Sequence, residues 1–107
     1  MTTYILNSPV LTAFGKYTYK PLTVEEARDW VLAADELISA IGHESTAKFL
    51  STLLNIEIPA NRVRITMKPG DVAVVFRVLQ RLPEGFVATE EELRSIPWEL
   101  GLLIREE

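Results

Sequence analysis

The chain has 107 residues, of which 48% are hydrophobic, with no cysteine, a single histidine and a formal net charge of −4 at pH 7. The missing cysteines exclude a disulfide framework and a thiolate zinc site, and one histidine excludes a multi-histidine metal site within one chain. No apolar run reaches the roughly 20 residues of a membrane span, and an acidic chain is a poor general binder of long nucleic acids. We therefore expect a single cytoplasmic domain over residues 1–107 that needs no metal or other cofactor.

The first part of the chain is predicted to form two short strands and a helix. Tyr4–Leu6 is apolar and ends at Asn7–Pro9, and residues 16–20 can add a second strand. Thr23 and Glu26 have the spacing of a capping box, in which each side chain accepts a hydrogen bond from the backbone N–H of the other residue. Apolar residues then recur at helical spacing, at Val24, Ala27, Val31 and Ala34. This pattern predicts a helix that begins directly after Thr23.

A buried strand and a second helix are predicted in the middle of the chain. Residues 38–41 form a short and mostly apolar run, which is typical of a buried strand. A helix is expected over residues 44–54, because apolar residues again recur at helical spacing, at Ala47, Leu50, Leu53 and Leu54.

Residues 62–80 are predicted to form a β-hairpin. From Arg62 to Lys68 polar and apolar residues alternate with the period of two that a half-buried strand requires. The segment 69–71 (Pro-Gly-Asp) has the composition of a turn. Residues 72–80 are more evenly apolar, as expected for a central strand.

The last part of the chain is predicted to add a helix and a strand. Thr89 and Glu92 repeat the capping-box spacing, and Pro97 would stop the short helix that they begin. Trp98–Ile104 then alternates as a last strand. The fold class expected from these elements is α/β, a single-domain mixed β-sheet flanked by helices.

The stretch 42–46 (Gly-His-Glu-Ser-Thr) holds the only histidine and lies where a strand is predicted to turn into a helix. The N-terminus of a helix presents unpaired backbone N–H groups and the positive end of the helix dipole, so it attracts phosphate. His43 can donate a proton near neutral pH, and the hydroxyls of Ser45 and Thr46 can hold phosphate oxygens. An alternative is that His43 is only a helix cap or a surface residue.

A second turn, at residues 80–85, carries Arg81 and Glu84. We expect the two turns to meet and to cleave a phosphodiester. Arg81 would stabilise charge on the phosphate, and Glu84 would either orient and charge His43 or act as general base. The alternative for Arg81 and Glu84 is a surface ion pair of little energetic value.

Basic residues gather between positions 62 and 81 although the chain is acidic: Arg62, Arg64, Lys68, Arg77 and Arg81. A local cationic patch suits a small anion better than a long duplex. The alternative is that acidic and basic residues coat opposite faces.

The chain resembles the viral anti-CRISPR ring nucleases in three motifs, at residues 39–46 (Ser-Ala-Ile-Gly-His-Glu-Ser-Thr), 61–63 (Asn-Arg-Val) and 80–85 (Gln-Arg-Leu-Pro-Glu-Gly). The resemblance implies degradation of cyclic tetra-adenylate, the second messenger of type III CRISPR systems, in the cytoplasm of an infected host. Its catalytic residues would be His43, Arg81 and Glu84. We also expect ligand contacts from the remaining candidates: Asn7, Ser8, Ser45, Thr46, Arg62 and Gln80.

The resemblance also implies a homodimer, because a two-fold dimer matches the two-fold symmetry of a cyclic tetranucleotide. Each protomer would then cut one of two opposite phosphodiesters, giving two linear di-adenylates with 2′,3′-cyclic phosphate ends. Three other classes stay open: a protein that sequesters a cyclic nucleotide without cutting it, an interaction protein that blocks a host complex, and a general ribonuclease. The net negative charge disfavours the ribonuclease.

Overall fold

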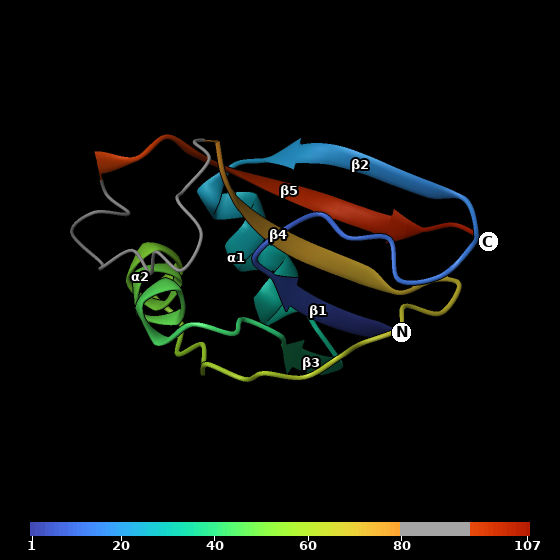
Figure 1. Cartoon of the computed structure of the whole chain (residues 1–107), viewed down its shortest axis with the longest axis horizontal. Coiled ribbons are helices and arrows are strands. Elements are labelled where there is room, and N and C mark those ends of the chain that lie inside the picture. Colours follow the sequence, from blue (N-terminus) through green and yellow to red (C-terminus); the bar gives the residue numbers. More distant parts are fainter. Residues whose placement is uncertain (80–94) are drawn as a thin grey trace.

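One mixed β-sheet with two helices organises the part of the chain described by the computed structural model, residues 1–79 and 95–107 (Figure 1). The strand order in the sheet is β2-β5-β4-β1-β3. In chain order the elements are β1 (Thr2–Leu6), β2 (Tyr17–Leu22), α1 (Val24–Leu32), β3 (Glu36–Ser39), α2 (Glu44–Leu54), β4 (Val72–Val78) and β5 (Trp98–Arg105). The expected α/β class with a mixed sheet flanked by helices is confirmed.

The direction of the strands brings several strand ends to one edge. β1 runs parallel to both β3 and β4, and β5 runs antiparallel to β4 and to β2. The carboxyl ends of β1, β3 and β4 therefore point the same way, toward α2 (Figure 1). We call this side of the sheet the carboxyl edge. In α/β sheets ligands bind outside the carboxyl ends of the strands, so this edge is where a site is expected.

Both helices pack their apolar stripes against one face of the sheet. The cluster on this face joins strand residues to helix residues: Ile5, Val74, Phe76 and Leu100 to Ala27, Val31, Phe49, Leu50 and Leu54. At its end near the carboxyl edge the rings of Phe49, Phe76 and Trp98 lie within 5.6–5.9 Å of one another, centroid to centroid. Burial of this apolar surface is the main force that fixes the helices to the sheet.

The other face of the sheet is covered by irregular segments. Met67 is fully buried there against the strand residues Tyr4, Leu6, Ala73, Val75 and Leu103. The Arg105 guanidinium ties the covering segments together, because it donates hydrogen bonds to the backbone carbonyls of Met67, Phe14 and Glu107. The Thr12 hydroxyl adds a further tie by accepting a hydrogen bond from the Met67 backbone N–H, at 2.8 Å.

The predicted N-terminal elements and both described helices are confirmed. The capping box is present, with the Thr23 N–H donating to Glu26 Oε1 at 2.9 Å and the Glu26 N–H donating to Thr23 Oγ1 at 3.1 Å. The bond from the Thr23 backbone N–H, and after it a bond from the Thr23 side chain, lower the pKa of the Glu26 carboxyl. The predicted strand over 38–41 lies two residues earlier, as β3, and the last strand is β5. The predicted helix at Thr89–Glu92 lies outside the described residues.

The predicted hairpin is wrong in its first arm. Residues 62–68 form no strand, because both sides of β4 are already paired, with β1 and with β5. The alternation has another cause: Met67 is buried and Ile65 half-buried against the sheet, while Arg64, Thr66 and Lys68 are exposed. Val63, the remaining apolar residue of the pattern, is also exposed. The turn itself is correctly placed, since the Asp71 N–H donates to the Lys68 carbonyl at 2.9 Å.

Candidate functional site at the start of α2

His43 stands at the junction between β3 and α2. It is the N-cap residue of α2, with extended backbone angles (φ −122°, ψ 131°), and its carbonyl accepts the Ala47 N–H at 3.1 Å. The side chain of His43 makes no capping hydrogen bond. The alternative that this histidine serves as a side-chain cap is therefore wrong, and the ring is not committed to holding the helix.

The segment after α2 returns to lie beside this junction. α2 ends at Asn55 in the left-handed conformation, at φ 55°. The Ser51 hydroxyl then fixes the returning chain: it donates to the Ala47 carbonyl within α2 at 2.7 Å and accepts the Ile58 N–H at 2.9 Å. Next along the chain, the Asn61 N–H donates to the Ile41 carbonyl at 2.7 Å. Residues 59–62 thereby run along the chain that leads into His43.

Arg62 reaches the same junction. Its Nε donates a hydrogen bond to the Gly42 carbonyl at 3.0 Å, which places the guanidinium at the residue directly before His43. A permanently charged group that suits phosphate is thus anchored one residue before His43.

Ser45 and Thr46 occupy the first turn of α2, as predicted. Ser45 Oγ is buried and has no hydrogen-bond partner within the described part of the chain. An unsatisfied buried hydroxyl costs about 1–3 kcal/mol. The helix start also supplies backbone N–H groups and the positive end of the dipole.

Asn7 and Ser8 directly follow β1 and are exposed at the same carboxyl edge. Because β1 lies between β3 and β4, these two residues leave the sheet next to the strand that leads to His43. The sheet therefore brings together the six described candidates, Asn7, Ser8, His43, Ser45, Thr46 and Arg62, at one side of the molecule. Gln80, Arg81 and Glu84 lie outside the described residues.

The predicted cationic patch is only partly present among the described residues. Arg62, Arg64 and Lys68 are exposed on the segment that covers the sheet. Arg77 is different, because its Nη1 lies 3.0 Å from Glu99 Oε1 on the neighbouring strand, where the ion pair offsets its charge. Arg81 lies outside the described residues.

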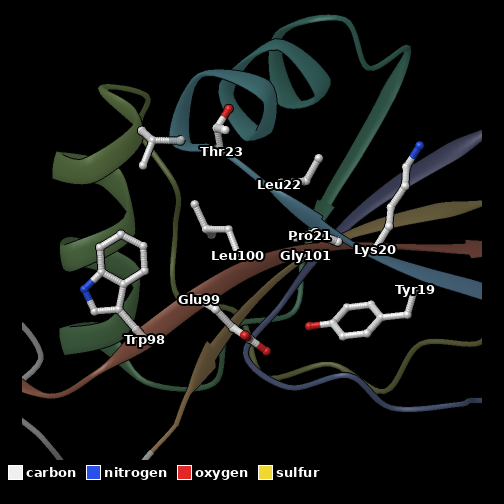
Figure 2. A pocket seen from close by; sticks show the side chains of 10 residues that line it. Tyr19, Lys20, Pro21, Leu22, Thr23, Trp98, Glu99, Leu100 and Gly101 are labelled. Atoms are coloured by element: carbon white, nitrogen blue, oxygen red, sulfur yellow. The ribbon is translucent and has the colours of Figure 1, made fainter.

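A separate hollow of about 590 Å³ opens where β2 leaves β5 to begin α1 (Figure 2). Leu22, Leu100 and Trp98 line it, with Lys20 and Glu99 at the same strand pair. None of the predicted site residues lines this hollow. The candidate site at α2 is thus distinct from it.

The described residues were also searched for a metal site and for a membrane-spanning helix. Within residues 1–79 and 95–107 no group of three or more His, Cys, Asp or Glu side chains could hold a metal ion. In the same ranges no helix is long and apolar enough to cross a membrane.

The chain belongs to the STIV B116-like family, whose model matches residues 3–100. It is similar to a protein of Sulfolobus islandicus filamentous virus, with 40% identity over 92% of this chain and 87% of the relative. It is also similar to the protein YddF of Bacillus subtilis, with 36% identity over 94% of each chain. Among solved structures, B116 of Sulfolobus turreted icosahedral virus has a TM-score of 0.76 and 26% identity, covering 98% of this chain and all of the other.

These comparisons confirm the coarser part of the resemblance. The family contains proteins of archaeal viruses, and the fold of the chain is that of a viral protein of this family. A bacterial relative shows that the family is not confined to viruses. Ring nuclease activity and the assignment of its residues stay predictions.

Proposed function

We propose that this protein is a metal-independent ring nuclease that cleaves cyclic tetra-adenylate to linear di-adenylate and so antagonises type III CRISPR signalling. The observation that supports this most is the hydrogen bond from Arg62 Nε to the Gly42 carbonyl, because it anchors a permanently charged side chain at the residue before His43. The His43 ring makes no capping hydrogen bond, and Ser45 lies in the first turn of the same helix. A phosphodiester uses the charge of the guanidinium, whereas a neutral ligand leaves it unused.

The reaction that fits these groups uses the ribose as its own nucleophile. The 2′-oxygen attacks phosphorus, the bond from phosphorus to the 5′-oxygen breaks, and a 2′,3′-cyclic phosphate forms. His43 donates a proton to the departing 5′-oxygen, and the arginines and the helix start stabilise the charge that builds on the phosphate. Glu84 either charges and orients His43 or accepts the proton of the 2′-hydroxyl. No step requires a metal.

The proposal includes a two-fold homodimer, in which each protomer applies one His43 to one of two opposite phosphodiesters. The support is the position of the candidate residues at the carboxyl edge, outside the packed core of the protomer. Measurement of the molar mass in solution by light scattering tests this part separately. A monomer that is fully active would exclude it.

A protein that only sequesters the cyclic nucleotide is the second candidate. It is favoured by the fact that Arg62 and the α2 start can hold an anion without turnover. The two candidates differ in the role of His43, which is essential for cleavage but supplies only one contact for binding.

The first experiment incubates the purified protein with radiolabelled cyclic tetra-adenylate in the presence of EDTA. Conversion to linear di-adenylate by the wild type, lost in His43→Ala with binding retained, supports the ring nuclease. An intact ring that co-elutes with the wild type supports sequestration. An intact ring that does not bind excludes both candidates. Linear RNA in a parallel reaction tests for a general ribonuclease.

A further inference from the structure

The junction between β3 and α2 lies at the open side of the sheet. β3 is the last strand in the sheet order, so the chain that leaves it has a strand neighbour on one side only. On that side the Ala40 N–H donates to the Ile5 carbonyl of β1 at 2.9 Å. The orientation of residues 40–43 therefore depends on what holds them from the other side.

Residues 59–62 hold the junction from that other side with a set of short hydrogen bonds. The Ser39 hydroxyl donates to the Pro59 carbonyl at 2.7 Å. Asn61 contributes twice, since its side-chain Nδ2 donates to the Ser39 carbonyl at 2.8 Å and its backbone N–H donates to the Ile41 carbonyl at 2.7 Å. Asn61 thus bonds to the last residue of β3 and to the residue before Gly42.

These bonds also decide where Arg62 lies. Arg62 follows Asn61 directly, and its Nε bonds to Gly42, which directly precedes His43. Two adjacent residues of the returning segment therefore hold three carbonyls of the chain that leads into His43, those of Ser39, Ile41 and Gly42. A shift of Asn61 along β3 would move the guanidinium and the histidine turn relative to each other.

We propose that Asn61 is a positioning residue, which fixes the His43 turn and the Arg62 guanidinium in one relative geometry. It acts through these two residues and not on a ligand. An amide fits the position, because the Ser39 carbonyl needs a donor there. Alanine offers none, and a carboxylate of the same shape would present a lone pair to that carbonyl. In its catalytic consequence this inference rests on the proposed function.

The experiment compares wild type, Asn61→Ala and Asn61→Asp, with Val63→Ala as the matched control. Val63 is 45% exposed on the same segment, and its backbone N–H, which alanine retains, donates to the Asn61 carbonyl at 3.2 Å. The first readout is the His43 imidazole signal in a carbon–proton NMR spectrum, which is unambiguous because the chain has a single histidine. The second readout is kcat and KM for cyclic tetra-adenylate.

We expect both Asn61 variants to shift or broaden the His43 signal. They should also lower kcat about tenfold or more and change KM less, because misplacing the reacting groups slows the reaction more than it weakens binding. Val63→Ala should match the wild type in both readouts. Asn61 variants that match Val63→Ala in the His43 signal and in kcat would overturn the inference. If Asn61→Ala does not fold, Ser39→Ala is used instead, because it removes the bond to Pro59 from the β3 side. The same two readouts apply, and values that match Val63→Ala would again overturn the inference.

The two proposals can fail separately. If the wild type leaves the ring intact, the ring nuclease is excluded, and the His43 signal alone decides whether Asn61 positions the turn. If the wild type cleaves the ring and the Asn61 variants do so at the same rate with an unchanged His43 signal, only the positioning role is excluded.

Discussion

Ser45→Ala is predicted to stabilise the free protein and to weaken its binding of a phosphodiester. Ser45 Oγ is buried without a partner among the described residues, so removing the oxygen relieves a desolvation cost of about 1–3 kcal/mol. Alanine also has the higher helix propensity, by about 0.5 kcal/mol. Some packing is lost with the oxygen, and we expect a net gain of about 1 kcal/mol. For a chain of this size such a gain raises Tm by about 4–8 °C.

The effect on binding has the opposite sign if the hydroxyl faces a bound phosphate. Loss of one hydrogen bond to a charged group costs about 1.5–3 kcal/mol, which weakens Kd by roughly 10- to 100-fold. Binding is measured by calorimetry with cyclic tetra-adenylate on the His43→Ala background, so that no turnover interferes. Stability is measured by urea unfolding without ligand.

Ser51→Ala is the matched control on the same helix. The Ser51 hydroxyl donates to the Ala47 carbonyl at 2.7 Å and accepts the Ile58 N–H at 2.9 Å. Its removal leaves buried groups unpaired and should destabilise the protein by about 1–3 kcal/mol. Destabilisation by Ser45→Ala to a similar extent would show that Ser45 is hydrogen-bonded in the free protein and would refute the reasoning.

Three further predictions concern the scaffold. Thr3→Val should raise the free energy of unfolding by about 1 kcal/mol in urea, because Thr3 Oγ1 is buried and unpartnered in the described part of the chain, and a lower value would contradict this. Arg105→Ala should lower it by about 2 kcal/mol, since three backbone carbonyls lose a charged donor, with Arg105→Lys as the partial rescue. Glu26→Gln should lower the free energy of unfolding at neutral pH but not at acidic pH. The capping bonds depress the pKa of Glu26 in the folded state, so its contribution is present above the unfolded pKa of about 4.3 and is lost as the pH falls through the folded pKa. Unfolding curves for Glu26→Gln and wild type that differ equally at pH 7 and pH 3 would exclude this linkage.

Sequence patterns of a few residues correctly predicted the helices, because contacts between near neighbours in the chain help to form them. The capping box at Thr23 and Glu26 and the helix after His43 depend on neighbours within four residues, and both are present. The period of two in residues 62–68 led to a wrong prediction of a strand. Alternation indicates that one side of a segment is buried, but it does not show that the segment is hydrogen-bonded to a neighbouring strand. The partners of β4 come from β1 and β5, which are distant in the sequence.

The candidate site likewise has a part that the local sequence predicts and a part that depends on residues distant in the chain. The start of α2 was predicted from the composition of residues 42–46, and the structure places His43 and Ser45 there. The hydrogen bond of the Asn61 side chain was not predicted, because its partner Ser39 lies 22 residues away in the sequence. Arg77 was assigned to the cationic patch because its partner Glu99 also lies 22 residues away, across a strand pair.

The two outer strands of the sheet also limit how one copy of the chain can meet another. At the end of β3 the Ser39 carbonyl accepts the Asn61 side chain, and two residues further on the Ile41 carbonyl accepts the Asn61 N–H, so these two carbonyls are not free to pair with an added strand. β2 at the other end contains Pro21, which has no N–H to donate, beside the exposed Lys20. Both features disfavour edge-to-edge pairing of sheets. Crowding of many copies in one cell should therefore not extend the sheet from chain to chain, and a symmetric pair would have to form through faces, loops or the carboxyl edge.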